Sequence, residues 1–77
     1  MTTITASQCR AARALIGWTR QQLANASGVG FSTIRDFETG RHVPHTANME
    51  AIVGAFDKAG AEFTNGDQPG VRLKRLP

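Results

Sequence analysis

The chain has 77 residues, of which 40% are hydrophobic and 19% charged, and this length and composition indicate one small folded domain. No apolar run approaches the roughly 18 residues that a membrane helix needs, and the single cysteine, Cys9, excludes an internal disulfide and leaves too few ligands for a structural zinc site. The formal charge is +3, with basic residues in excess over 1–45 and acidic residues over 46–70, so either a polyanionic partner or simple solvated charge explains it.

The first predicted helix begins near residue 6, within the stretch "ITASQC". Thr5 caps this helix and Gln8, three residues later, reaches back to the cap. Ile4 and Cys9 flank the capping box as a hydrophobic staple. Gly17 ends the helix, because glycine readily adopts the left-handed conformation at a helix C-terminus.

The same pattern recurs in "WTRQQL", which predicts a second helix from about residue 20. Thr19 is its cap, Gln22 reaches back, and Trp18 and Leu23 form the staple. Both helices are too short to be stable alone, so each is expected to pack through an apolar face. The residues of these two faces are Cys9, Ala12, Leu15 and Ile16 in the first helix and Leu23 and Ala24 in the second.

Two further helices follow. One spans residues 31–38, with Ile34 and Phe37 facing inward and Gly40 as its left-handed stop. The other is bounded by Thr46 and Gly60 and has an apolar stripe at helical spacing, made of Met49, Ile52, Val53 and Phe56. Residues 1–60 are therefore predicted to form a four-helix cluster.

After Gly60 the hydrophobic pattern changes from helical to alternating. "AEFT" and "VRLK" each place apolar residues on one face, and the turn-rich "NGDQPG" lies between them. Glu62 and Arg72 are expected to pair across the polar face. The predicted fold class is thus mainly α. Residues 61–77 are predicted to form a short C-terminal strand or hairpin and a basic tail, whose last basic residue is Arg75.

The break between the second and third helices occurs at "GVG". Gly28 supplies the positive φ that the turn needs, and Ala24 is small because the third helix crosses close to it. The wedge between the two helices is filled by apolar residues, namely Leu23, Val29, Ile34 and Phe37. Two helices joined by such a short turn form a helix-turn-helix, in which the second helix enters the DNA major groove.

Here the chain resembles the helix-turn-helix DNA-binding domain of the phage repressor and Cro (XRE) type, found in small bacterial transcriptional regulators. The resemblance rests on "TRQQLANASGVGFSTIRDFETGRHVP" preceded by "CRAARALIGW", and covers about residues 5–60. It implies sequence-specific binding of double-stranded DNA by a regulator, expected to be a repressor, with helix 31–38 as the recognition helix.

The resemblance also implies roles for residues outside the recognition helix. Arg13 and Glu38 match a partly buried structural salt bridge. Thr19 and Arg20 match phosphate contacts at a helix N-terminus, where backbone amides favour an anion. The remaining predicted contacts to the DNA backbone are Thr33, Arg41 and His42.

Base contacts are expected from the outward side of helix 31–38, from Phe31, Ser32, Arg35 and Asp36. Arg35 either addresses guanine with two nitrogens or contacts a phosphate or Asp36. Phe31 either meets a thymine methyl group or folds back over the edge of the core. The sequence departs from the family pattern at Phe31 and Asp36, where amides or basic groups are usual, and at Gly30, which lacks the usual capping hydroxyl.

The hairpin stands where many phage repressors have a fifth helix that forms the dimer. Because one such domain covers only a short half-site, a homodimer is expected. We hypothesise that residues 61–75 supply the contact, either by strand pairing between chains or by packing of Phe63, Val71 and Leu73 across a two-fold axis. The alternative is an intramolecular hairpin that closes the core.

The alternative function is a protein-interaction adaptor or antitoxin that uses the same fold and binds a protein partner. Catalysis is not expected, since no nucleophile and base pair or phosphate-binding loop is evident. Metal binding is not expected, because His42 and His45 do not share a helix face. No other cofactor and no small-molecule substrate are expected either. The N-terminus lacks a secretory signal, so the expected location is the cytoplasm, in association with the nucleoid.

Overall fold

The computed structural model describes residues 3–74; Arg75, at the end of the basic tail, lies outside them. The elements in chain order are α1 (Ala6–Ile16), α2 (Arg20–Ser27), α3 (Phe31–Glu38), α4 (Thr46–Lys58), β1 (Ala61–Thr64) and β2 (Gly70–Leu73). Four helices followed by an antiparallel hairpin confirm the predicted fold class. Within residues 3–74, no helix has the length and apolar character that crossing a membrane requires.

Both predicted capping boxes are present. The Thr5 hydroxyl accepts a hydrogen bond from the Gln8 backbone N–H at 3.0 Å, and the Gln8 side-chain oxygen accepts one from the Thr5 N–H at 2.8 Å. Thr19 and Gln22 repeat the arrangement at 3.1 and 2.8 Å. Each box satisfies two helix N–H groups that would otherwise lack partners, which explains why α1 and α2 begin where they do.

The starts of α3 and α4 depend on packing instead of side-chain caps. The residue before α3 is Gly30, and no side chain caps the helix there. The residue before α4 is His45, whose side chain makes no capping hydrogen bond, and the predicted boundary residue Thr46 is the first helical residue. Both helices are anchored by buried apolar side chains, including Ile34 of α3 and Phe56 of α4.

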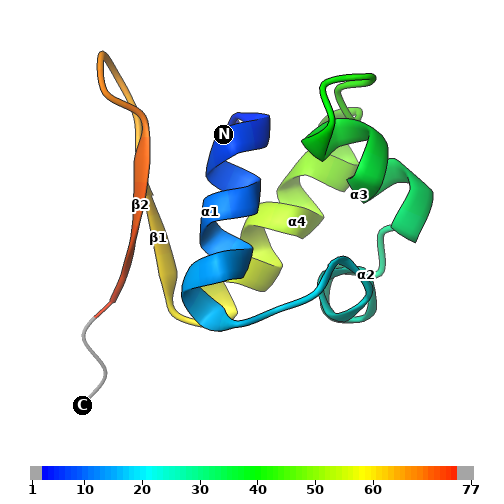
Figure 1. Ribbon diagram of the computed structural model, residues 1–77, viewed down its shortest axis with the longest axis horizontal. Helices are drawn as coiled ribbons and strands as arrows, with labels where there is room; N and C mark the ends of the chain where they lie inside the picture. The colour runs from blue at the N-terminus through cyan, green and yellow to red at the C-terminus, as the bar shows by residue number, and fades with distance from the viewer. Residues whose placement is uncertain (1–2, 75–77) are drawn as a thin grey trace.

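The hydrophobic core lies between all four helices and the hairpin (Figure 1). The helix α2 packs on α3 and α4, while α1 packs on α3 and on both strands. The core side chains are Ile4, Cys9, Ala12, Leu23, Ala24, Val29, Ile34, Phe37, Met49, Ile52, Ala55, Phe56 and Ala61. This set includes every residue predicted to fill the wedge between α2 and α3.

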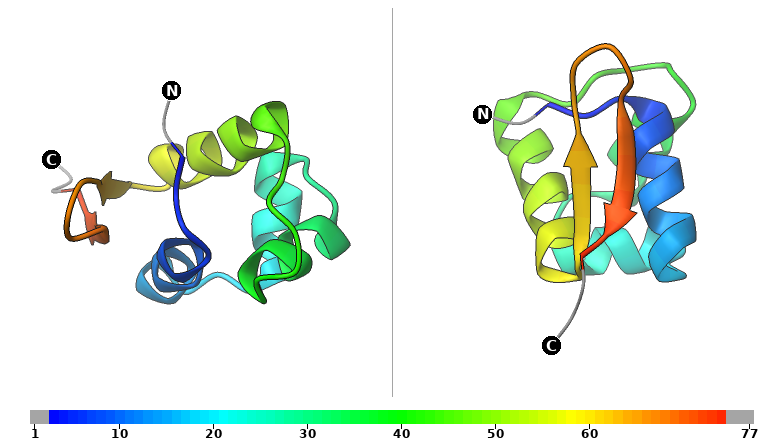
Figure 2. Two further views of the ribbon diagram at one scale, coloured as in Figure 1. Left: turned by 90° about the horizontal axis from the view of Figure 1, so that it is seen from above. Right: turned by 90° about the vertical axis from the view of Figure 1, so that its left-hand side faces the viewer.

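The hairpin lies at the end of the molecule away from α2 and α3, with β1 beside α4 and β2 beside α1 (Figure 2). Its register pairs Phe63 with Val71 and Glu62 with Arg72. The Phe63 ring meets the Phe56 ring edge-on, with 5.7 Å between centroids. The strands therefore pair within one chain, which is the intramolecular arrangement considered above.

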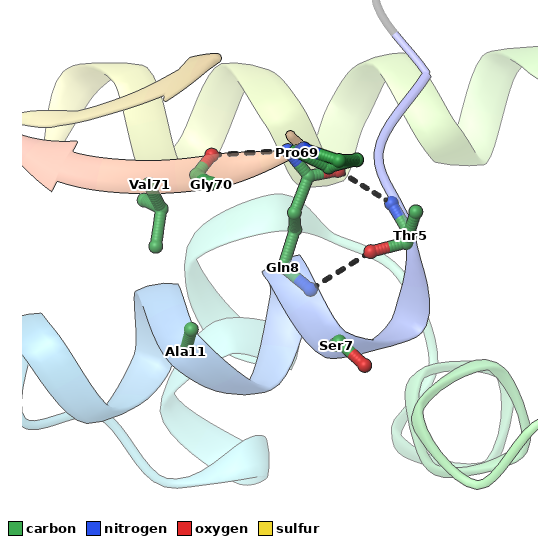
Figure 3. Close-up of a pocket in the computed structure, with 7 residues that line it drawn as sticks. All are labelled: Thr5, Ser7, Gln8, Ala11, Pro69, Gly70 and Val71. Carbon is green, nitrogen blue, oxygen red and sulfur yellow. Dashed lines mark hydrogen bonds between the residues drawn. The ribbon is translucent and has the colours of Figure 1, made fainter. Parts of the chain in front are cut away.

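A buried side chain from α1 anchors the turn end of the hairpin. The Gln8 amide nitrogen donates to the carbonyl oxygen of Thr64 at 2.9 Å. It also donates to the carbonyl oxygen of Gly70 at 3.0 Å (Figure 3). Below this anchor, an open cavity of about 440 Å3 separates α1 from β2, and Val71 points into it toward Ala11. The residues that line the cavity are uncharged.

Candidate nucleic-acid interface

The turn between α2 and α3 holds the two helices at a fixed angle. Gly28 has a φ of 75°, in the left-handed region that favours glycine. The Ser27 hydroxyl accepts a hydrogen bond from the Val29 N–H at 3.1 Å, and the Val29 side chain is buried between the helices. Ala24 is also buried, so α3 crosses close to the backbone of α2.

The side of α3 that faces solvent carries the predicted base contacts. Ser32 and Arg35 are exposed, and the Phe31 side chain is 40% exposed. Thr33 and Asp36 are half-buried at the edges of this surface. Phe31 is therefore not folded into the core, and the outward side of α3 is available to a partner.

Arg35 and Asp36 form an ion pair on this surface, with 3.3 Å between Arg35 Nε and Asp36 Oδ1. Within residues 3–74, the two terminal nitrogens of Arg35 make no hydrogen bond. Asp36 thus contacts the Arg35 guanidinium through Nε alone. The Nη1 and Nη2 atoms of Arg35 stay available, and together they can donate to one guanine.

The predicted contacts to the DNA backbone lie at both ends of the helix-turn-helix. Thr19 is exposed at the start of α2, where its hydroxyl caps the helix. Arg41 and His42 are exposed in the loop after α3, and both of their backbone N–H groups donate to the Asp36 carbonyl, at 2.8 and 3.2 Å. These bonds fold the loop back against the end of α3. Arg20, in contrast, is partly buried and forms an ion pair with Glu38.

Glu38 is the charged residue at the centre of the helical cluster, and its side chain is fully buried. Arg13 donates to both carboxylate oxygens, from Nε at 2.7 Å and Nη2 at 2.8 Å. Arg20 Nε adds a bond at 2.8 Å, and the Cys9 thiol donates to Oε2 at 3.1 Å. The Glu38 backbone carbonyl accepts from Arg10. One residue at the end of α3 is therefore bound to α1 and to the start of α2.

These contacts set the protonation states of the cluster. Burial raises the pKa of Glu38, but the hydrogen bonds from Arg13, Arg20 and Cys9 outweigh burial, so the pKa lies below its usual range. Burial, together with the hydrogen bond to the Glu38 carboxylate, raises the pKa of the Cys9 thiol far above its usual range. Cys9 is therefore a neutral donor to a charged carboxylate.

Sequence reasoning named the Arg13 and Glu38 pair but missed three of its neighbours. From the sequence, we predict a hydrophobic staple role for Cys9, a phosphate contact for Arg20 and no role for Arg10. A polar partner for Cys9 has no local signal, because Glu38 lies 29 positions away. The surplus of arginines in residues 1–45 was the one available indication that more than one of them meets Glu38.

The three residues predicted for dimer contact are placed differently from one another. Phe63 and Val71 pack against the chain's own core. Leu73 remains 51% exposed at the end of β2. Of the three, Leu73 offers the largest free apolar surface.

A family model described as helix-turn-helix matches residues 10–63, which is more than half of the chain. The chain therefore belongs to this helix-turn-helix family, the phage repressor and Cro type that the sequence resembles. Membership supports a DNA-binding regulator, in a family that is generally not enzymatic. No curated protein matches the chain in a sequence search.

Proposed function

We propose that the chain is a sequence-specific regulator of transcription, acting as a repressor, that binds double-stranded DNA with α3 in the major groove. The observation that carries the proposal is the division of α3 into two sides. Ile34, Phe37 and Glu38 are buried, while Phe31, Ser32 and Arg35 remain exposed on a helix held firmly against α2. A helix with a free polar side and a fixed attachment suits groove binding.

In this proposal Arg35 is the main base contact and Asp36 orients it. The Nε of Arg35 is bound to Asp36 at 3.3 Å, and the terminal nitrogens address O6 and N7 of a guanine. Ser32 contacts a neighbouring base edge, and the exposed Phe31 ring meets the methyl group of a thymine. Asp36 itself stays close to Arg35, because an isolated carboxylate near phosphates is repelled.

The backbone contacts of the proposal lie on both sides of α3. Thr19 and Arg20 face one phosphate at the start of α2, where unpaired amides favour an anion. Arg41 and His42 grip the strand beyond the end of α3, and Thr33 contributes from its edge. The protein acts in the cytoplasm on nucleoid DNA, where its target lies.

The test is selection of bound sites from random duplexes, repeated with Arg35→Ala. The variant should lose preference at one base position by about 1–3 kcal/mol. Lys58→Ala is the control, because it removes an exposed cation at the end of α4, outside α3 and outside the hairpin. An Arg35→Ala chain that selects the same sites as the wild type contradicts the proposed readout. A reporter promoter overlapped by the selected site should be silenced if the protein represses.

We further propose that the protein acts as a homodimer, joined through the hairpin. A contact there leaves α3 free for DNA, because the hairpin lies at the opposite end of the molecule (Figure 1). Leu73 supplies the exposed apolar surface, and Phe63 and Val71 hold the hairpin in place. Sedimentation of the wild type and Leu73→Asp is the test, with Val43→Asp as the control at an exposed valine outside the hairpin. A monomeric wild type ends the dimer proposal.

A further inference from the structure

The Glu38 carboxylate has no remaining capacity for hydrogen bonds. A carboxylate offers about four lone-pair sites to donors. At Oε2 they are taken by Arg13 Nε and the Cys9 thiol, and at Oε1 by Arg13 Nη2 and Arg20 Nε. All the donors come from the chain itself, so the group is fully satisfied in its buried position.

The two arginines bound to this carboxylate use their guanidinium groups differently. All three guanidinium nitrogens of Arg13 donate within the protein: Nε and Nη2 to Glu38, and Nη1 to the Trp18 carbonyl at 3.0 Å. Arg20 donates to Glu38 from Nε alone. Within residues 3–74, the Nη1 and Nη2 atoms of Arg20 make no hydrogen bond, and the side chain is 31% exposed against 18% for Arg13. Arg20 therefore keeps the donors that a further partner can use.

The charges of the cluster point to the nature of that partner. Arg13 alone neutralises Glu38, so the charge of Arg20 is in excess. Arg20 is also the first residue of α2, where the first turn contains no acidic side chain. The helix dipole and the free amides of this turn add to the positive potential. An oxyanion with two acceptor oxygens matches the two free nitrogens.

We propose that Glu38 is a positioning residue for DNA binding, which holds Arg20 by its Nε so that Nη1 and Nη2 bind one DNA phosphate. The inference rests on the proposed function and specifies how one of its phosphate contacts is made. A free arginine side chain loses much rotational freedom when it binds, and a guanidinium already fixed to a buried carboxylate loses less. The buried carboxylate thus strengthens a contact that it never touches.

The first experiment compares the salt dependence of binding for the wild type, Arg20→Ala and Arg20→Lys, with the duplex selected by the wild type as the probe. Arg20→Ala removes one phosphate contact per subunit. It should therefore make the slope of log K against log salt less steep by about 0.9 per bound subunit, or about 1.8 for a dimer. Arg20→Lys should keep the slope but bind about 5-fold more weakly, because an ammonium group cannot bridge Glu38 and a phosphate as a planar fork does. Lys58→Ala, which removes an exposed cation at the end of α4 outside both α3 and the hairpin, is the control and should change neither quantity.

Thermal unfolding of each variant separates this role from a purely structural one. If Arg20→Ala lowers the melting temperature while the salt slope stays at the wild-type value, the proposal is overturned. An Arg20→Lys chain that binds as tightly as the wild type overturns the positioning role of Glu38. If the wild type binds no duplex, the proposed function fails first and this inference fails with it.

A second experiment tests Glu38 directly by a double-mutant cycle. Glu38→Gln should weaken DNA binding more in the wild-type background than in the Arg20→Ala background, because only the wild type has an Arg20 side chain for Glu38 to hold. Equal losses in both backgrounds contradict the coupling between the two residues. If Glu38→Gln does not fold, the Arg20→Lys comparison alone decides.

Discussion

Replacing Glu38 by glutamine removes the negative charge from the centre of the helical cluster with little change in shape. The side chain is fully buried, and the substitution leaves Arg13 and Arg20 without a counter-charge. Removing one partner of a buried ion pair costs about 3–5 kcal/mol. Both arginines keep some contact with water, at 18% and 31% exposure, so we expect the lower end of the range, about 3 kcal/mol.

This loss is large relative to the stability of so small a domain. At roughly 0.05–0.15 kcal/mol per residue, a chain of 77 residues has a free energy of unfolding of about 4–12 kcal/mol. One kcal/mol shifts the melting temperature of a domain of this size by about 4–8 °C, so we expect a decrease of about 12–24 °C. Circular dichroism at neutral pH, as a function of temperature and of urea concentration, measures it.

The matched control is the same substitution at an exposed ion pair. Glu62 and Arg72 lie 2.6 Å apart on the hairpin, with side chains 43% and 71% exposed. Such pairs contribute about 0–1 kcal/mol, so Glu62→Gln should lower the melting temperature by only a few degrees. If Glu38→Gln and Glu62→Gln have the same melting temperature, the buried carboxylate does not hold the helices together and the reasoning above is refuted.

Four further predictions concern other parts of the structure. Folding lowers the pKa of Glu38, so its contribution to stability should be complete above the unfolded pKa of about 4.3. The contribution should be lost as the pH falls from there through the folded pKa, and measuring the melting temperature against pH will show this. Gly28→Ala should lower the free energy of unfolding in urea by about 1–2 kcal/mol, because Gly28 has a φ of 75°. Gly54→Ala should raise it by about 0.5–1 kcal/mol, because Gly54 lies within α4 and has open space for the new methyl group. The Cys9 thiol should react with a thiol reagent only as fast as the protein unfolds, and faster labelling would show that it is accessible. Gln8→Ala should cost about 1–3 kcal/mol and speed amide hydrogen exchange in both strands, because the carbonyls of Thr64 and Gly70 lose the buried amide that donates to them.

The parts of the fold that could be predicted from the sequence are those specified by neighbouring residues. A capping box needs only four positions, so "ITASQ" and "WTRQQ" indicate the starts of α1 and α2. Gly17 and Gly28 likewise mark helix ends through their own backbone preference. The direction in which the hairpin folds back depends on distant contacts, such as the Phe56 and Phe63 rings and the Gln8 amide, which no local pattern shows.

The candidate site shows the same limit. The outward side of α3 follows from helical periodicity once Ile34 and Phe37 are taken as buried, and the structure has them buried. The pairing of Arg13 with Glu38 is implied by the family resemblance and is present in the structure. Residues 1–45 contain several other arginines, and the sequence does not say which of them also binds the Glu38 carboxylate. Only the packing of α1 and α2 brings Arg20 to it.

The orientation of α3 is determined mainly by tertiary contacts, and this explains why a buried residue matters for a surface function. A helix of eight residues is too short to be stable alone, and Gly30 gives this one no side-chain cap. Its first turn is fixed by apolar packing of Val29 and Ile34, and its last residue is Glu38, bound to Arg13 of α1 and to the start of α2. A change at Glu38 therefore tilts or loosens the exposed side of α3 as a unit. Its effect on DNA binding should fall on base and phosphate contacts together, whereas Arg35→Ala should affect one base position alone.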